Sequence, residues 1–169
     1  MFRIQTTPQA ELTGKAAELF AMFPPQLGVP EPLLLLAGSP GLLAVKAAAV
    51  EYSRSHPDLG FEMLAAIRHL AAKQLSAPAC VDFNAKLLRA AGLDDAEIAT
   101  LPEAGGAFTE AERALLGFVL RALRQPGSVT DADIAEQRGH GWKDATILDA
   151  LAHAADMQVP ALLMRALKR

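Results

Sequence analysis

The strongest signals of how this chain folds lie in Pro57–Pro102, which reads PDLGFEMLAAIRHLAAKQLSAPACVDFNAKLLRAAGLDDAEIATLP. Apolar residues recur at helical spacing over its first third and predict a long helix. Pro78 then stands near the start of a second helix, which carries Cys80 and ends at Gly92. The acidic run Asp94–Glu97 is typical of a helix N-terminus and predicts a short third helix.

The segment that follows repeats this design. Residues 92–98 (GLDDAEI) and 141–147 (GWKDATI) share the pattern Gly, apolar, any residue, Asp, Ala, any residue, Ile. Each copy follows one predicted helix and leads into another, and Thr109 with Glu112 has the pattern of a capping box at the start of the second half. Two copies are too few for a solenoid. We therefore expect an all-α fold built on two related helical hairpins.

The chain is expected to form a single helical domain over residues 1–169, divided into three parts. Residues 1–54 supply N-terminal helices that cover the core, residues 55–102 carry the cysteine, and residues 108–169 form the second half. The segment Glu103–Phe108 (EAGGAF) is the most loop-like and is predicted to be a hinge between the halves.

Local sequence signals also predict where the flanking helices begin and end. Helical spacing of apolar residues predicts an amphipathic helix over residues 8–23, which the pair Pro24–Pro25 ends. Ser76 has the side chain of a helix N-cap and is predicted to cap the cysteine helix. Pro160 lies within the last apolar run and must kink or split its helix, because proline lacks a backbone N–H and crowds the preceding turn.

The composition excludes two classes of protein. Hydrophobic residues make up 51% of the chain, and Ala and Leu, which favour helices, supply most of them. The net charge of −3 offers no basic stripe, so nucleic-acid binding is not expected. The most hydrophobic stretch, Pro32–Val50, is broken by glycine, proline and lysine and is too interrupted to span a membrane.

Cysteine usage and surface chemistry bear on location and assembly. A single cysteine cannot form an intrachain disulfide, and the N-terminus shows no secretion signal, so a cytoplasmic location is expected. The Ala- and Leu-rich faces exceed what a small monomer needs to bury. We therefore expect a homo-oligomer.

Over residues 55–165 the chain resembles the carboxymuconolactone decarboxylase and alkylhydroperoxidase D-like (AhpD-like) family. The resemblance rests on the apolar helix that leads into a short cysteine helix, and on two later segments. These are NAKLLRAAGLDDAEIATL (residues 84–101) and SVTDADIAEQRGHGWKDATILDALAHAA (residues 128–155). It implies an all-helical fold and an oligomer that assembles through helical faces.

In the peroxidase branch of that family the reaction uses a glutamate, a Cys-x-x-Cys motif and a histidine four residues beyond the second cysteine. One thiolate attacks the peroxide, the second resolves the sulfenic acid as a disulfide, and Glu and His transfer the protons. Here the motif reads Ala-Pro-Ala-Cys, residues 77–80, with Asn84 at the histidine position. The glutamate position falls near Ala65, and Glu62 lies one helical turn away. Only Cys80, the second cysteine, is retained. The resemblance therefore implies the fold and the place of the site, without the full proton relay.

Two functions of different classes follow from these residues. In the first, Cys80 is the candidate peroxidatic thiol of a one-cysteine hydroperoxide reductase, an antioxidant oxidoreductase that an external thiol regenerates. The alternative is a helical module without redox chemistry, in which a pocket lined by Ala65, Ala77, Cys80 and Asn84 binds a small molecule or nothing. A lactone decarboxylase is a third option, although no proton donor stands at the family position. No cofactor and no metal ion are expected.

Cys80 itself has two interpretations. At the start of its helix, the helix dipole would favour the thiolate, and Asn84 could hydrogen-bond a thiolate or sulfenate but cannot act as a base. A free cysteine in an apolar helix is also commonly a small buried hydrophobe. Asp82 is interpreted as a solvated acid of the first helical turn, although its charge would oppose a thiolate if it lay close.

Two histidines carry predictions of their own. His153 shares a predicted helix face with Asp149 and Asp156, which allows either a metal site or hydrogen bonds between helices. His69 is predicted to lie on a solvated stripe together with Glu62 and Lys73.

Overall fold

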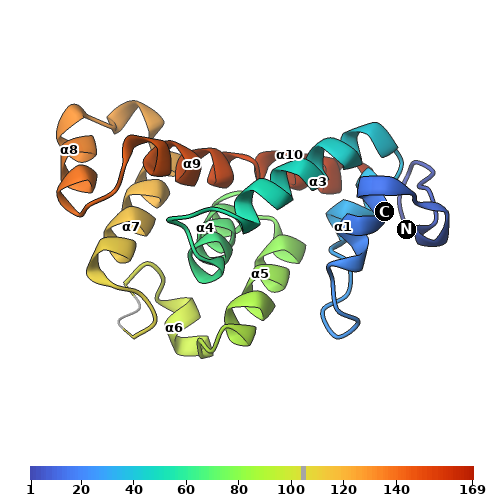
Figure 1. Ribbon diagram of the computed structural model, residues 1–169, viewed down its shortest axis with the longest axis horizontal. Coiled ribbons are helices and arrows are strands. Elements are labelled where there is room, and N and C mark those ends of the chain that lie inside the picture. The colour runs from blue at the N-terminus through green and yellow to red at the C-terminus, as the bar shows by residue number, and fades with distance from the viewer. Residues whose placement is uncertain (104–105) are drawn as a thin grey trace. The chain divides into compact units, whose positions relative to one another are not determined.

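The computed structural model describes residues 1–103 and 106–169 (Figure 1). Ten α-helices and two short 3-10 helices form the described part of the chain, where the only extended pairing is an isolated bridge between Phe2 and Lys168. The all-α prediction is confirmed. Of the predicted hinge Glu103–Phe108, Ala104 and Gly105 lie outside the described residues, and the hinge stays a prediction. No described helix is long and apolar enough to cross a bilayer.

The chain divides into two compact units, one of residues 1–56 and 158–169, the other of residues 57–157. The first unit contains η1 (Gln9–Glu11), α1 (Gly14–Ala21), α2 (Glu31–Leu36), α3 (Pro40–Arg54) and α10 (Gln158–Leu167). The second contains α4 (Phe61–Gln74), α5 (Pro78–Ala90), α6 (Asp95–Ala99), α7 (Glu110–Arg124), η2 (Pro126–Ser128), α8 (Asp131–Gly139) and α9 (Asp144–Ala155). The single domain over residues 1–169, with its inner boundaries, stays a prediction.

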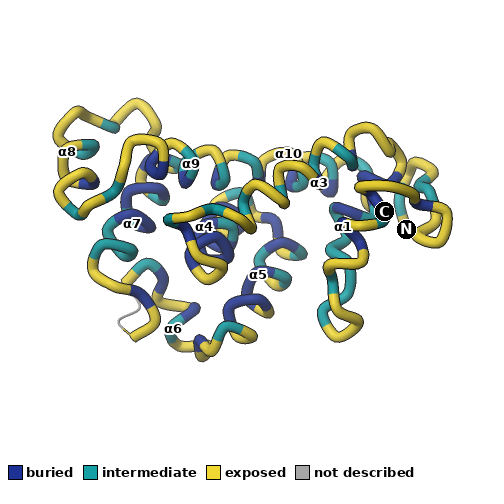
Figure 2. Tube along the Cα trace, in the orientation of Figure 1, coloured by how far each residue is buried: buried dark blue, intermediate teal, exposed yellow. Residues whose placement is uncertain are grey.

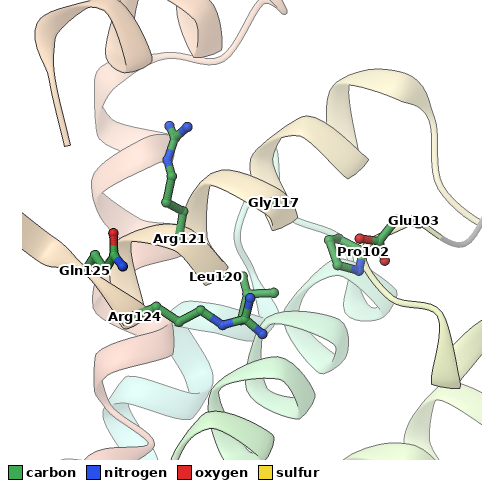
Figure 3. A pocket seen from close by; sticks show the side chains of 7 residues that line it. All are labelled: Pro102, Glu103, Gly117, Leu120, Arg121, Arg124 and Gln125. Carbon is green, nitrogen blue, oxygen red and sulfur yellow. The ribbon is translucent and has the colours of Figure 1, made fainter. Parts of the chain in front are cut away.

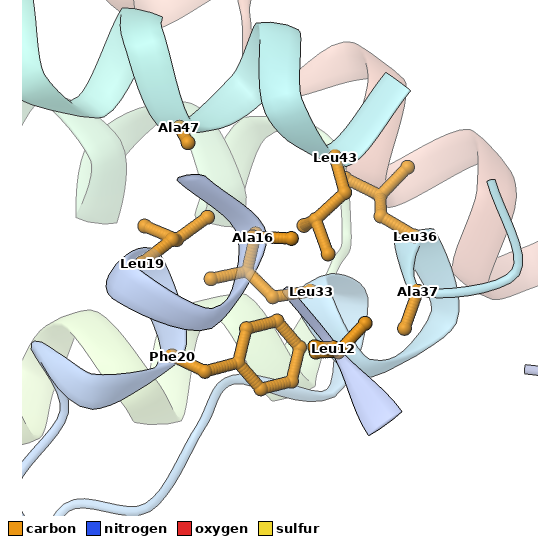
Figure 4. Packing of buried hydrophobic residues seen from close by; sticks show 9 residues of the cluster. All are labelled: Leu12, Ala16, Leu19, Phe20, Leu33, Leu36, Ala37, Leu43 and Ala47. Atoms are coloured by element: carbon orange, nitrogen blue, oxygen red, sulfur yellow. The ribbon is translucent and has the colours of Figure 1, made fainter. Parts of the chain in front are cut away.

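The first unit is held together by a small apolar core. Nine buried side chains from α1, α2, α3 and their flanking residues make up this cluster, as Figure 4 shows: Leu12, Ala16, Leu19, Phe20, Leu33, Leu36, Ala37, Leu43 and Ala47. α10 packs against α2, with Leu163 against the cluster. The backbone N–H of Arg3 donates to the carbonyl of Leu167 (2.8 Å), so both ends of the chain belong to this unit.

Of two predicted boundaries in the flanking helices, one is wrong and one is confirmed. The helix expected over residues 8–23 is wrong in its first part, because the chain is extended at Leu12 and Thr13 and α1 begins only at Gly14. Gly14 has a φ of +58°, a left-handed conformation that favours glycine and starts the helix afresh. Pro160 splits the last helix as predicted, and it lies in the first turn of α10, where its missing N–H has no intrahelical partner to lose.

α4 is the centre of the second unit. It packs against α5, α7 and α9 (Figure 1). Most of α4 is buried (Figure 2). From Met63 to Ala72 every residue is buried except Arg68, which is partly buried. Alanine occupies many of these positions, and its small side chain allows neighbouring helices to approach closely. Arg68 is therefore the only charged residue within the buried segment of α4, Met63–Ala72.

The predicted hairpin repeat is confirmed in the second unit. α4, α5 and α6 form a first copy, α7, α8 and α9 form a second, and matching residues lie 49 positions apart, from 92 to 141 and from 95 to 144. α5 and α8 are each followed by a glycine with positive φ, Gly92 (+103°) and Gly141 (+92°). Beyond the glycine, an N–H returns to a helical carbonyl, from Leu93 to Leu88 and from Trp142 to Gln137.

Side chains repeat between the copies as well. Nε of Arg89 donates to Oδ1 of Asp95 at 2.7 Å, and Nε of Arg138 donates to Oδ1 of Asp144 at the same distance. Ile98 and its counterpart Ile147 are both buried. The repeat seen in the sequence is therefore a repeat of backbone turns, ion pairs and core contacts.

Most predicted helix starts are confirmed. Reciprocal capping boxes begin α6 at Asp94, α7 at Thr109 and α8 at Thr130. The cap predicted at Ser76 is wrong, because Ser76 adopts a φ of +51° and Ala77 occupies the N-cap position of α5. α5 therefore begins without a side chain that satisfies its first N–H groups.

Candidate functional site

Cys80 lies in the first turn of α5, two residues after Pro78. The residue is only 6% exposed and is therefore buried. The first turn of α5 lacks a side-chain cap, and the N–H dipoles of such a turn favour negative charge nearby. Position and burial therefore act on the thiol in opposite directions, because burial favours its neutral form.

Asn84 lies one helical turn beyond Cys80 and is buried. Its Nδ2 donates to the backbone carbonyl of Cys80 at 2.8 Å, and its Oδ1 accepts a hydrogen bond from Nε of Arg68 at 2.8 Å. The amide thus ties the first turn of α5 to α4. Both ends of the side chain are engaged, so Asn84 acts as a structural link between the two helices.

Arg68 continues the chain of hydrogen bonds to a third helix. Its Nη1 lies 2.8 Å from Nε2 of His153 on α9. A guanidinium only donates, so Nε2 of His153 accepts and the imidazole is neutral, with its proton on Nδ1. The polar residues Asn84, Arg68 and His153, which we call the Arg68 cluster, therefore join α5, α4 and α9.

The charge of Arg68 is not balanced by a carboxylate. Burial lowers the pKa of its guanidinium to about 10, which still leaves it protonated at neutral pH. Among the described residues its partners are an amide and a neutral imidazole, and no Asp or Glu forms an ion pair with it. A partly buried cation held only by neutral groups retains much of its desolvation cost.

Arg68 is not among the residues that the sequence pattern singles out as a site. The pattern indicates Cys80 and Asn84, whereas Arg68 lies within a mostly apolar stretch. The available signal was that Arg68 is the only charged residue between Glu62 and Lys73. A lone cation in an otherwise buried helix needs a partner, and this reasoning would have singled it out.

The other predicted pocket residues are also enclosed. Ala65 at the glutamate position and Ala77 are buried, whereas Glu62 and Asp82 are exposed. A depression of about 340 Å³ lies elsewhere in the unit (Figure 3). It is lined by Pro102, Glu103 and the part of α7 between residues 117 and 125, and none of the predicted pocket residues contributes to it.

His69 is not on a solvated stripe. It is 3% exposed, and its Nδ1 lies 3.3 Å from the backbone carbonyl of Val81 on α5. The prediction was wrong because α4 is packed on several sides, so its polar residues are not all directed to water. Burial lowers the pKa of His69 below its usual 6.5, and the positive charges of Lys73 and Arg89 lower it further.

His153 forms the hydrogen bond between helices that was one of its two predicted roles. Over residues 1–103 and 106–169, no three His, Cys, Asp or Glu side chains come together as a group that could hold a metal ion.

Two solved structures resemble this chain along nearly its whole length. One is an uncharacterized peroxidase-related protein from Silicibacter sp. TM1040, with a TM-score of 0.78 and 18% identity over 94% of this chain and 86% of that one. The other is an alkylhydroperoxidase AhpD core, an uncharacterized peroxidase-related protein from Ralstonia eutropha JMP134, with a TM-score of 0.74 and 20% identity over 98% and 90% of the two chains. No family model and no curated protein matches. The fold is therefore AhpD-like.

Proposed function

We propose that this chain is a one-cysteine, thiol-dependent hydroperoxide reductase in which Cys80 is the reacting group. The observation that carries the proposal is the hydrogen-bonded chain from the carbonyl of Cys80 through Asn84 to Arg68. It links a permanent cation to the helix turn that bears the only thiol of the protein. Thiols at helix N-termini and near arginine are the ones that ionise at neutral pH.

The proposed reaction has three steps. The thiolate of Cys80 attacks the terminal oxygen of a hydroperoxide, the O–O bond breaks, and the alkoxide takes a proton from water and leaves as an alcohol. An external thiol then attacks the sulfenic acid, releasing water and forming a mixed disulfide. A second external thiol reduces that disulfide and restores Cys80, so one hydroperoxide consumes two thiols.

This chain lacks the proton-transferring residues of the Cys-x-x-Cys peroxidases. Asn84 cannot transfer a proton, and Ala65 has no acid to offer. Asn84 is a positioning residue that holds the first turn of α5, and Arg68 supplies positive charge. The alcohol-forming proton therefore comes from solvent, and we expect turnover to be slow.

The pH dependence of alkylation at Cys80 tests the proposal. In the native protein we expect a midpoint below the value of about 8.5 typical of a free thiol, together with a trapped sulfenate after addition of peroxide. Arg68→Gln should raise the midpoint by about 1 pH unit. Arg121→Gln, which removes an arginine from the second copy, should leave it unchanged. If Arg68→Gln leaves the alkylation midpoint of Cys80 unchanged, the proposed role of the cation is contradicted.

Burial favours a second candidate, a helical module without redox chemistry. Cys80 is only 6% exposed, and the family's glutamate position is an alanine that is itself buried. In that case Cys80 would react with alkylating agents and peroxide only after unfolding. Repeating the alkylation and peroxide treatment on the unfolded protein therefore separates the two candidates, because only the reductase requires Cys80 to react in the native state.

We also propose that the chain is a homo-oligomer. Large apolar side chains are exposed in both units, among them Val45 (66%) and Leu148 (66%). Light scattering at micromolar concentration should show a dimer or a larger species. A purely monomeric protein would remove this proposal.

A further inference from the structure

We propose that Arg68 is an anion-recognition residue whose guanidinium binds the carboxylate of an organic acid next to Cys80. The inference rests on the proposed function and extends it, because the hydroperoxide substrate would then be one that carries a carboxylate. Arg68 acquires a second role, recognition of the substrate, beside its effect on the thiol.

The guanidinium of Arg68 has more N–H donors than its neighbours accept from. Arg68 uses Nε for Asn84 and one N–H of Nη1 for His153. Within the described residues, Nη2 donates to no acceptor. Arg68 is partly exposed, and Nη2 is not among the fully buried side-chain atoms that lack a partner, so this end of the guanidinium retains some exposed surface. Two polar neighbours thus fix the plane of the guanidinium and leave one end available.

The positive charge of Arg68 also favours the binding of an anion. No carboxylate of the described residues compensates Arg68, and its burial makes the isolated cation unfavourable. An anion that binds to the free end would recover part of that cost. Charge-assisted hydrogen bonds to arginine are stronger than neutral ones, and a planar carboxylate matches the guanidinium with two parallel bonds.

The charge also selects the kind of anion. No other charged group acts appreciably on Arg68, whose pKa is lowered by burial alone. A single positive charge matches a singly charged group, whereas a phosphate dianion would leave one negative charge unbalanced in a poorly hydrated site. Asn84 and His153 are neutral and add no further cationic donor. A monocarboxylate is therefore the ligand that this site fits.

The binding test needs no peroxide and no catalysis. Thermal unfolding of the whole protein would be followed at pH 7 and constant ionic strength with hexanoate, with hexanamide and with chloride. Hexanoate should raise the unfolding temperature in a saturable way, and the uncharged amide should not. An equal response to hexanoate and hexanamide, or an equal response to chloride, would overturn carboxylate recognition.

Three variants locate the effect. Arg68→Gln should abolish the response to hexanoate, and Arg68→Lys should retain a weaker one because it keeps the charge but loses the planar fork. Arg121→Gln removes an arginine that already bonds to Asp133, and it should leave the response intact. If Arg68→Gln does not unfold cooperatively, the wild-type comparison of acid with amide and the Arg68→Lys variant still decide the question.

A kinetic test separates this inference from the proposed function. Wild type should reduce a hydroperoxy fatty acid roughly 10- to 100-fold faster, in kcat/KM, than its methyl ester. In Arg68→Gln the acid-to-ester ratio should fall to about one. Equal rates for acid and ester in wild type would refute carboxylate recognition and leave the reductase proposal standing. Hexanoate binding without any peroxide reduction would refute the reductase and leave the anion site.

Discussion

The two copies in the second unit have the same backbone plan but different chemistry at matching positions. Where the first copy has Arg68, the second has Gly117, and where the first has Cys80, the second has Val129. Turns, ion pairs and buried isoleucines are shared, as described above. The repeat therefore explains the scaffold, and the candidate site consists of positions at which the first copy departs from it.

The copies also differ in how each holds an arginine. In the second copy Nη2 of Arg121 pairs with Oδ1 of Asp133, the counterpart of Asn84, so the cation has a carboxylate partner. Hydrogen bonds from Thr130, followed by the charge of Arg121, lower the pKa of Asp133. In the first copy Arg68 reaches an amide instead. A closed ion pair suits a structural role, whereas an uncompensated cation suits a binding site.

The largest effect is expected at Leu88, which is fully buried at the end of α5. Leu88→Ala should lower the free energy of unfolding by about 2–5 kcal/mol, because it leaves a cavity in the core of the first copy. Urea unfolding with an unchanged m-value would measure it. A loss below about 1 kcal/mol would mean that the first copy is loosely packed.

The glycines after α5 and α8 test whether the copies are equivalent. Gly92→Ala and Gly141→Ala should each cost about 1–2 kcal/mol, because both residues have positive φ. A Cβ at either position meets no atom within 4 Å, so the cost is one of backbone conformation alone. Unequal losses in urea unfolding would show that the two turns are not equivalent.

Gln137 occupies the position in the second copy that Leu88 occupies in the first. Replacing it should raise the free energy of unfolding, whereas Leu88→Ala lowers it. Gln137 is 2% exposed, and its Oε1 is the one buried side-chain polar atom of the described residues without a hydrogen-bond partner. Gln137→Leu should raise the unfolding free energy by about 1 kcal/mol, because it removes an unsatisfied group and keeps similar volume. Destabilisation in urea would indicate that Oε1 has a bound water or ligand.

His69 and its counterpart Phe118 are equally buried, but only His69 titrates. Because the folded pKa of His69 lies below 6.5, the unfolded chain binds the proton more readily. Its contribution to stability is complete above about pH 6.5 and is lost as the pH falls from there towards the lower folded pKa. His69→Phe should flatten the unfolding free energy over this range, with His69→Gln as a smaller, non-titrating control. An unchanged pH slope would assign the acid sensitivity to another group.

The smallest effects are expected from the repeated ion pairs. Arg138 bonds to Asp144 through both Nε and Nη2, at 2.7 and 2.9 Å, whereas Arg89 meets Asp95 through Nε alone. A double-mutant cycle to alanine should give weak coupling in both copies, stronger for the second. The hydrogen bonds from Arg138 lower the pKa of Asp144, so that coupling should fade as the pH drops below about 3.8. Equal coupling would show that the second bond adds nothing.

Local sequence patterns were enough to predict the helices, the capping boxes and the repeat, because these features depend on neighbours within a few residues. Composition and apolar spacing predicted the all-α fold, and the glycines marked where α5 and α8 end. Local signals failed at Ser76 and near Gly14, where the backbone adopts a left-handed conformation that spacing does not reveal. For the candidate site, the sequence supplied Cys80 and Asn84 only.

Long-range packing of the helices determines which polar residues contact one another. Arg68 and His153 are 85 residues apart in the chain, and no local pattern joins them. The burial of His69 likewise follows from helices that pack around α4 from distant parts of the sequence. Helix formation is governed by local hydrogen bonds and propensities, whereas burial and charge balance depend on long-range packing. The helical scaffold is therefore predictable from the sequence, whereas the polar contacts of the candidate site are recognised only in the folded structure.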